Sequence, residues 1–175
     1  MRHPLLTVFP TLSLILAMPF TGSSLAQTQT VLWPSAMHLF SISVPPGWGT
    51  TQTDDGVSFQ IYPPDKTCSV VASYLKNAQL AGRSTSDMAT EIGAKAGLGQ
   101  FADAGPAVIS GVKGEAFSAT QPDPSGGGLW IVRLIFVPLE PGLWAGEFVK
   151  WPQSATPAQQ AACNAGAEAV TLIKH

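Results

Sequence analysis

The fold is decided by the segment LWIVRLIFV at residues 129–137, because it is apolar at both alternating positions of a strand. Successive side chains of a strand point to opposite faces of the sheet, so both faces must be covered at this strand. A single charge, Arg133, interrupts the run. The segment therefore predicts a central strand in a sheet that lies between two other layers.

Shorter segments predict the neighbouring strands. Residues 40–44 (FSISV) and 57–62 (VSFQIY) alternate apolar and polar side chains, which is the pattern of a strand with one buried face. Further strands are expected at residues 68–74, 106–110, 112–119 and 143–151. The connections contain Pro and Gly and are short enough to join antiparallel neighbours.

Two segments change to helical spacing. Residues 84–97 begin with Ser84 and Asp87 at the spacing of a helix cap, and a second helix is expected from Thr156, which precedes Pro157, to about residue 173. Strands, a helix, more strands and a final helix predict an α+β domain with a mostly antiparallel sheet and helices packed on it.

The first 26 residues have the three parts of a secretory signal peptide. A basic start at Arg2 precedes an apolar run at residues 5–20, and small residues follow at Ser24 and Ala26. The alternative is an anchored N-terminal helix, but such a span needs ~20 apolar residues and prolines interrupt this run. We expect cleavage after Ala26 and export to the periplasm. A lipid anchor is not expected, because no cysteine lies near the cleavage site.

The predicted organisation is therefore a signal peptide at residues 1–26, a leader at 27–37 and one domain at 38–175. The whole chain holds 9 Lys and Arg and 11 Asp and Glu, and charged residues make up 11% of it, against ~25% in ordinary soluble domains. No basic cluster or basic amphipathic helix is present in the sequence. We expect no nucleic-acid partner and no stable membrane insertion after signal cleavage.

The two cysteines, Cys68 and Cys163, predict one disulfide, because an even number in an exported chain is typical of a bridge. Cys68 shares strand parity with Val70, and Cys163 shares a helical stripe with Gly166. Both sulfur atoms are thus expected to face the core. The alternative is two buried free thiols.

Arg133 and Glu147 are the charges inside the most apolar strands. If Val137 pairs with Leu143 across the turn, Arg133 lies directly opposite Glu147. We expect a structural ion pair. The alternative is a pair that anchors a ligand, which requires both side chains to line an open pocket.

Catalysis is not expected from this sequence. Beyond the predicted signal peptide the histidines are His38 and His175, and the chain has no Gly-x-Ser-x-Gly, His-x-x-x-His or Cys-x-x-Cys motif. We predict no enzyme, no cofactor and no metal site. A hydrolase that uses carboxylates alone would need two acids ~5–9 Å apart across a cleft, and the sequence pairs none. Trp48, which follows a turn, is the candidate binding residue.

The stretch FSISVPPGW at residues 40–48 resembles the opening of PsbP-like domains and of related periplasmic proteins such as DcrB. The order of the predicted elements over residues 38–173 is compatible with that family. The resemblance implies an α-β-α sandwich that serves as a non-catalytic accessory or binding scaffold, and it assigns no functional residue.

Two functions follow from these expectations. The first is an exported periplasmic binding or accessory protein that works through an unknown protein partner. The alternative is an immunity or inhibitor protein that blocks a periplasmic toxin or enzyme, with the loop at residues 121–128 as its contact surface.

Overall fold

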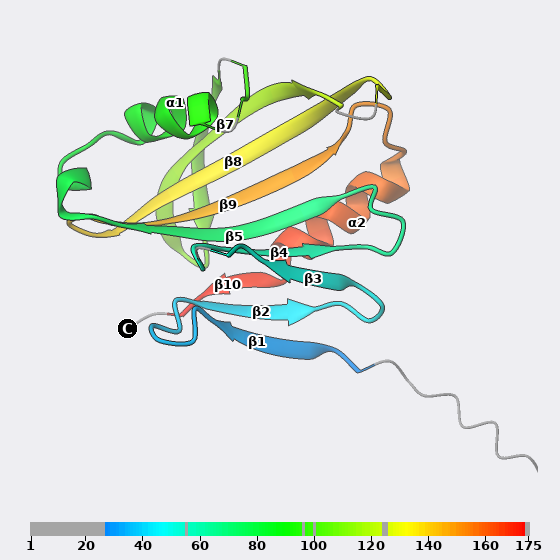
Figure 1. The fold of residues 1–175 in the computed structure, drawn as a ribbon, viewed down its shortest axis with the longest axis horizontal. Coiled ribbons are helices and arrows are strands. Elements are labelled where there is room, and N and C mark those ends of the chain that lie inside the picture. Colours follow the sequence, from blue (N-terminus) through cyan, green and yellow to red (C-terminus); the bar gives the residue numbers. More distant parts are fainter. Residues whose placement is uncertain (1–26, 55, 96, 100, 124–125, 174–175) are drawn as a thin grey trace, which may run out of the picture.

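The computed structural model describes residues 27–54, 56–95, 97–99, 101–123 and 126–173 (Figure 1). The predicted signal peptide at residues 1–26 lies outside the described residues. No helix in the described ranges is long and apolar enough to cross a membrane.

A seven-stranded sheet forms the centre of the domain, and every pair of neighbours in it is antiparallel. The strands in spatial order are β3 (Gly49–Gln52), β4 (Ser58–Tyr62), β5 (Ser69–Lys76), β9 (Leu143–Pro152), β8 (Leu129–Glu140), β7 (Val112–Pro122) and β6 (Ala102–Ile109). The segment at residues 129–137 lies inside this sheet, between β7 and β9. This confirms the expected interior strand and the mostly antiparallel α+β fold.

A second sheet of three strands consists of β1 (Gln29–Trp33), β2 (Phe40–Val44) and β10 (Val170–Leu172). The boundary predicted at residue 38 is wrong, since β1 pairs with β2 along its whole length. Trp33 is 3% exposed, and its ring contacts those of Phe40 and Tyr74 at centroid distances of 5.7 and 5.4 Å. Burial of this large ring makes the predicted leader part of the domain.

Helix α1 (Thr85–Lys95) follows a short 3₁₀ turn at Ala78–Leu80, and α2 (Pro157–Glu168) follows β9. The capping box predicted at Thr156 is present, with reciprocal hydrogen bonds to Gln159. The expected end of this helix near residue 173 is wrong. Val170 and Leu172 are buried on either side of an exposed Thr171, and this alternation pairs them with β2 as β10.

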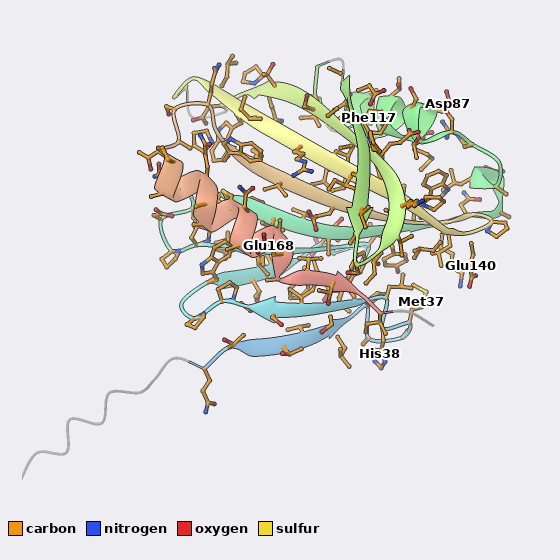
Figure 2. All side chains as sticks on the ribbon, turned by 180° about the vertical axis from the view of Figure 1, so that it is seen from behind. Met37, His38, Asp87, Phe117, Glu140 and Glu168 are labelled. Carbon is orange, nitrogen blue, oxygen red and sulfur yellow. A yellow bond between two sulfur atoms is a disulfide. The ribbon has the colours of Figure 1, made fainter. Side chains whose placement is uncertain are left out.

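The two faces of the large sheet are covered differently (Figures 1 and 2). On one face lie α2 and the small sheet, which enclose the larger core around Phe40, Ile61 and Val137. The other face carries α1 over a smaller core around Met88, Leu134 and Phe136. The expected α-β-α sandwich is thus present, and the small sheet completes the layer of α2.

Cys68 and Cys163 are joined as a disulfide whose Cα atoms lie 5.7 Å apart, within the range that the bond requires. Cys68 precedes β5 and Cys163 is in α2, so the bridge holds the helix on the sheet. Both side chains are buried, at 2% and 1% exposure, as the strand and helix patterns predict.

Candidate binding trough

The face of the sheet that carries α1 is only partly covered. Helix α1 contacts β7 and β8, whereas the sheet has seven strands. Strands lie ~4.8 Å apart and a helix is ~10 Å across, so one helix covers about two strands. Helix α1 therefore leaves part of this face open: Trp144 of β9 is buried in the smaller core, whereas Val71 of β5 and Phe148 of β9 are only half-buried.

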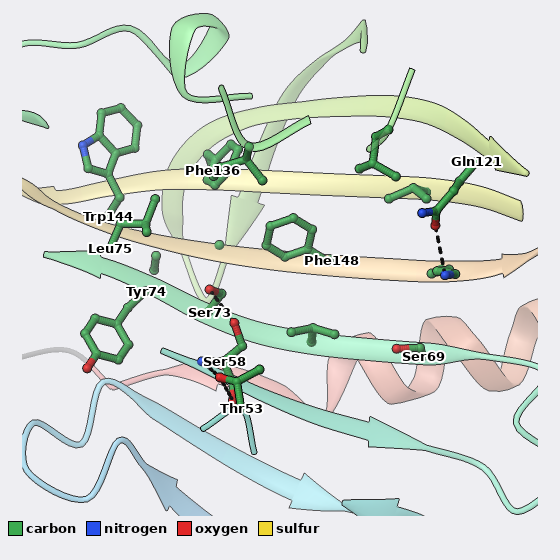
Figure 3. Close-up of a pocket in the computed structure, with 17 residues that line it drawn as sticks. Thr53, Ser58, Ser69, Ser73, Tyr74, Leu75, Gln121, Phe136, Trp144 and Phe148 are labelled. Atoms are coloured by element: carbon green, nitrogen blue, oxygen red, sulfur yellow. Dashed lines mark hydrogen bonds between the residues drawn. The ribbon is translucent and has the colours of Figure 1, made fainter. Parts of the chain in front are cut away.

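An open cavity of about 660 Å³ lies on this uncovered area, and we call it the trough (Figure 3). Its apolar lining comes from β5, β8, β9, α1 and the segment after α1, and consists of Val71, Leu75, Ile92, Leu98, Val132, Phe136, Trp144 and Phe148. The Phe136 and Phe148 rings meet edge to face, with centroids 6.0 Å apart. The trough thus presents aromatic and aliphatic surface to solvent.

Gly146 lies on the floor of the trough, between the two phenylalanine rings. A Cβ atom at this position would lie 3.1 Å from Phe136 Cε1 and 3.4 Å from Phe148 Cε2. Glycine therefore allows both rings to lie across β9 at this point.

The opposite side of the trough carries hydroxyl groups from β4 and β5 (Figure 3). Ser58 Oγ and Ser73 Oγ are 3.1 Å apart, and Ser73 Oγ donates to the Val57 carbonyl at 3.0 Å. Ser69 Oγ accepts from Gln60 Nε2 at 2.8 Å. Each hydroxyl oxygen has two lone pairs and one proton, so these groups retain capacity toward a ligand.

A second cavity, of about 360 Å³, adjoins the trough near the start of β5 and shares Ser69 and Lys150 with it. We call this region the basic end. Lys150 Nζ lies 4.9 Å from the centre of the Trp130 ring and donates to Gln121 Oε1 at 3.0 Å. Lys66 Nζ lies 5.8 Å from the Tyr62 ring. Asp123 also lines this cavity.

A third cavity, of about 480 Å³, lies near the end of β5 and shares Tyr74, Leu75 and Ile92 with the trough. The three cavities therefore follow β5 from one end to the other. Glu91 at this far end forms an ion pair with Arg83. Lys76 also lines this far-end cavity, so one cation and one anion lie there, against two cations and one anion at the basic end.

Trp48, the candidate binding residue, belongs to the other face of the sheet. Its half-buried ring packs against the larger core and on Gly166 of α2, where an added Cβ would lie 2.7 Å from Trp48 Cη2. This contact gives Trp48 a packing role. Its part in binding stays a prediction.

The predicted register of Arg133 and Glu147 is wrong. Glu140 pairs with Leu143, and an irregularity between Pro138 and Glu140 shifts the ladder, so that Arg133 pairs with Val149 and Glu147 with Ile135. The shift is two residues, which keeps both charges on the α2 face as diagonal neighbours. Arg133 is exposed, and within the described residues no ion pair joins it to Glu147.

Glu147 is 6% exposed and is the charged residue of the buried set. Burial raises the pKa of Glu147 from 4.5 to about 7, and the nearby positive charge of Arg133 lowers it only in part. Loss of hydration disfavours the charged form of a buried carboxyl. Glu147 does not line the trough, so this carboxyl is a structural group of the covered face.

The trough and the adjoining basic end together offer apolar contact, hydroxyl groups and two cations, which are the means of binding a ligand. Within the described residues, no group of three His, Cys, Asp or Glu side chains is placed to hold a metal ion. The described part of the chain also brings no histidine into the three cavities along β5.

Sequence reasoning did not predict the trough. The alternation of side chains in β4 and β5 could have indicated it. Ser58, Ser69 and Ser73 point to the same face of the sheet as Val71 of β5 and Phe148 of β9. Hydroxyl groups on one side of a sheet face indicate that no layer covers it there. In residues 129–137 the side chains on both faces are apolar, because β8 is one of the strands that α1 contacts.

No model of a known protein family and no curated protein matches the sequence. Solved structures do share the fold. PsbP from the cyanobacterium Synechocystis sp. PCC 6803 aligns with a TM-score of 0.56 and 10% identity, over 87% of this chain and 96% of that one. The chain has a PsbP-like fold. The resemblance carried by residues 40–48 is thereby confirmed at the level of the fold.

Two other structures share the PsbP-like fold. LpqN of Mycobacterium tuberculosis, described as involved in cell envelope biogenesis, aligns with a TM-score of 0.51 and 15% identity over 85% of this chain and 91% of that one. A protein from Bacteroides thetaiotaomicron VPI-5482 aligns with a TM-score of 0.53 and 16% identity over 85% of this chain. This chain spans 50% of the length of the Bacteroides protein.

Proposed function

We propose that this protein is an exported, non-catalytic binding protein of the periplasm that holds an apolar ligand in the trough. The observation that carries the proposal is the half-buried apolar surface of Val71, Leu75 and Phe148 along an open cavity of about 660 Å³. Binding sites for small ligands are concave, mostly apolar and of this size. Helix α1 covers only part of this face, and Ile92 of α1 lines the cavity, so a ligand bound here would remove the remaining apolar surface from water.

The envelope setting is supported by three features. The first 26 residues have the pattern of a signal peptide, the domain carries a disulfide, and LpqN, which shares the fold, is described as involved in cell envelope biogenesis. Disulfides persist in oxidising compartments such as the periplasm. An accessory role is also what the PsbP-like resemblance implies. No observation favours the inhibitor alternative.

Export is tested by mass spectrometry of the protein from a periplasmic fraction. The expected chain begins at Gln27. A mature protein that keeps Met1 or Arg2 contradicts the periplasmic assignment.

Binding in the trough is tested with N-phenyl-1-naphthylamine, an uncharged probe that fluoresces in apolar surroundings. We expect saturable binding that is weakened at least fivefold by Gly146→Val, which fills the floor, and by Phe148→Ser, which removes an aromatic surface. Val108→Ser is the matched control, because Val108 is a 57% exposed apolar side chain on β6, away from the trough. Unchanged binding in both trough variants, with melting curves that show them folded, contradicts the proposal.

A further inference from the structure

We propose that Lys66 and Lys150 select the ligand by its charge, so that the occupant of the trough is a single-chain anionic amphiphile. Its carboxylate or phosphate monoester lies at the basic end and its alkyl chain follows β5. This inference rests on the proposed function, since it names the class of ligand that the trough holds.

The first support is the arrangement of the two lysines. Lys66 comes from the turn between β4 and β5, and Lys150 comes from β9, yet both line one cavity. Each ammonium lies over an aromatic ring, that of Tyr62 or Trp130. An ammonium held on a ring keeps its N–H donors available, so these contacts position the lysines without neutralising them.

The second support is the charge balance at the basic end. Within the described residues neither lysine forms an ion pair within 4.0 Å, and Lys150 donates to an uncharged amide, Gln121. Asp123 contributes one negative charge to the cavity lining against two positive charges. The cavity therefore favours an anion, and the ammonium groups supply charge-assisted hydrogen bonds to its oxygens.

The loop that carries Lys66 is held in a defined shape. Asp65 Oδ1 accepts from the backbone N–H and from the hydroxyl of Thr67, at 3.2 and 2.8 Å. Lys66 has a φ of 53°, a left-handed conformation that is uncommon for a residue with a side chain. The loop thus fixes the backbone of Lys66 before a ligand arrives, so no loop ordering is needed on binding.

The third support is the length of the apolar path. The three cavities follow β5, which has eight residues, and at ~3.3 Å per residue they extend for roughly 23 Å. This length suits an extended alkyl chain and exceeds the size of a single sugar or amino acid. The far-end cavity is lined by one cation, Lys76, and one anion, Glu91, whereas two lysines line the basic end, so an anionic head group prefers the basic end.

A peptide strand is disfavoured as the occupant. The floor consists of β5 and β9, and both have hydrogen-bonded neighbours on each side. A peptide that adds to a sheet needs an open edge, and the edges of this sheet are β3 and β6. An alkyl chain needs no backbone partner, so it fits the middle of a sheet face.

The test is calorimetric titration of the exported protein with amphiphiles of one chain length, below their micelle concentrations. Dodecyl phosphate and dodecanoate should bind at least tenfold more tightly than dodecyltrimethylammonium. Inorganic phosphate alone should bind at least a hundredfold more weakly than dodecyl phosphate. Equal affinity for anionic and cationic amphiphiles overturns the proposal, and so does inorganic phosphate that binds as tightly as dodecyl phosphate.

Variants assign the effect to the lysines. Lys66→Met and Lys150→Met keep most of the side-chain length and should each weaken dodecyl phosphate binding about tenfold, a larger factor than for the uncharged probe N-phenyl-1-naphthylamine. Lys113→Met is the matched control, because Lys113 is exposed on β7 and lines none of the three cavities. If the neutral probe binds and the lysine variants keep full affinity for dodecyl phosphate, the charge selection is wrong and the trough remains.

Two other outcomes separate the proposals. If neither the neutral probe nor any amphiphile binds, the proposed function itself fails. Flotation with phosphatidylglycerol vesicles distinguishes a free amphiphile from a membrane surface, and the protein is expected to stay unbound. Stable flotation that Lys66→Met and Lys150→Met abolish would make a lipid bilayer the partner and overturn the inference.

Discussion

The two faces of the seven-stranded sheet consist of the same strands but differ in how fully they are covered. On the α2 face, side chains of β5, β8 and β9 are enclosed by a helix, a small sheet and a disulfide. On the α1 face, one helix leaves the trough open over β5 and β9. Because side chains alternate between faces, alternate residues of β5 and β9 pack into the larger core or face the trough. Substitutions on the two faces should therefore separate stability from binding.

The largest effect is expected from the bridge on the covered face. Cys68→Ser with Cys163→Ser removes a cross-link between residues 95 positions apart, and the chain-entropy model assigns about 4.7 kcal/mol of stability to a loop of this length. Denaturant titration should show the corresponding loss in the free energy of unfolding. Binding of N-phenyl-1-naphthylamine to the variant, measured where it is still folded, should remain. A variant that unfolds at the same denaturant concentration as the parent contradicts this assignment.

A large pH-dependent effect is expected at Glu147. Its folded pKa is raised from 4.5 to about 7, so between these values the folded state holds a proton that the unfolded state has released. Stability from this group is therefore lost as the pH rises from 4.5 to about 7, and the loss amounts to about 3 kcal/mol. Glu147→Gln should remove this loss and make the protein more stable than the parent at pH 8.

Unfolding titrations at pH 4 and pH 8 measure this effect, and Glu140→Gln on the exposed end of β8 is the matched control. A directly opposed ion pair with Arg133 implies the reverse sign, namely destabilisation by Glu147→Gln at pH 8. The experiment thus also decides between the two registers.

An intermediate effect on stability is expected where a helix glycine lies against an aromatic ring, which occurs once on each face of the sheet. Gly166 of α2 meets Trp48 and Gly93 of α1 meets Phe101, and an added Cβ would lie 2.7 Å from the ring in both cases. Alanine is the better helix former by ~1 kcal/mol. On the covered face overpacking should outweigh this gain, and Gly166→Ala should lose about 1–3 kcal/mol.

Gly93→Ala should cost less than Gly166→Ala, because a Cβ at Gly166 would also lie 3.2 Å from the buried Val70 side chain, whereas a Cβ at Gly93 closely approaches the Phe101 ring alone. Thermal melts of the two variants compare the faces directly. Equal losses would show that the α1 face is packed as tightly as the α2 face.

The smallest effect is expected from the hydroxyl side of the trough. Ser73→Ala removes a side chain that bonds Ser58 and the Val57 carbonyl at a half-buried position. A net hydrogen bond contributes about 1 kcal/mol, so stability should fall by no more than this. A loss of several kcal/mol would mean that this side of the trough belongs to the core.

Much of the fold could be predicted from local patterns. The alternation in residues 40–44 and 57–62, the cap at Thr156 and the parity of Cys68 each depend on neighbours in sequence, and the structure agrees with them. What could not be predicted depends on distant partners. The register of Arg133 depends on an irregularity between Pro138 and Glu140. The three-residue strand β10 forms because it pairs with β2, which is far away in the sequence.

The trough was beyond prediction for a related reason. Whether a sheet face is covered depends on where α1 docks, and the sequence of α1 does not state which strands it will contact. The hydroxyl residues Ser58, Ser69 and Ser73 give the one local hint of an open face. Likewise the apolar stretch at 129–137 shows that its strand is covered but not how far the cover extends.

The pairing of β10 with β2 has a consequence for synthesis of the chain. Val170 lies against Ile42, and Cys163, which closes the bridge to Cys68, precedes it by only a few residues. A growing chain therefore completes neither closure until Cys163 and β10 have left the ribosome, and forming such distant contacts requires a large loss of chain entropy. A premature stop or a proteolytic cut before Cys163 removes the bridge, α2 and the last strand together, and leaves both the larger core and the edge of β2 open to other chains.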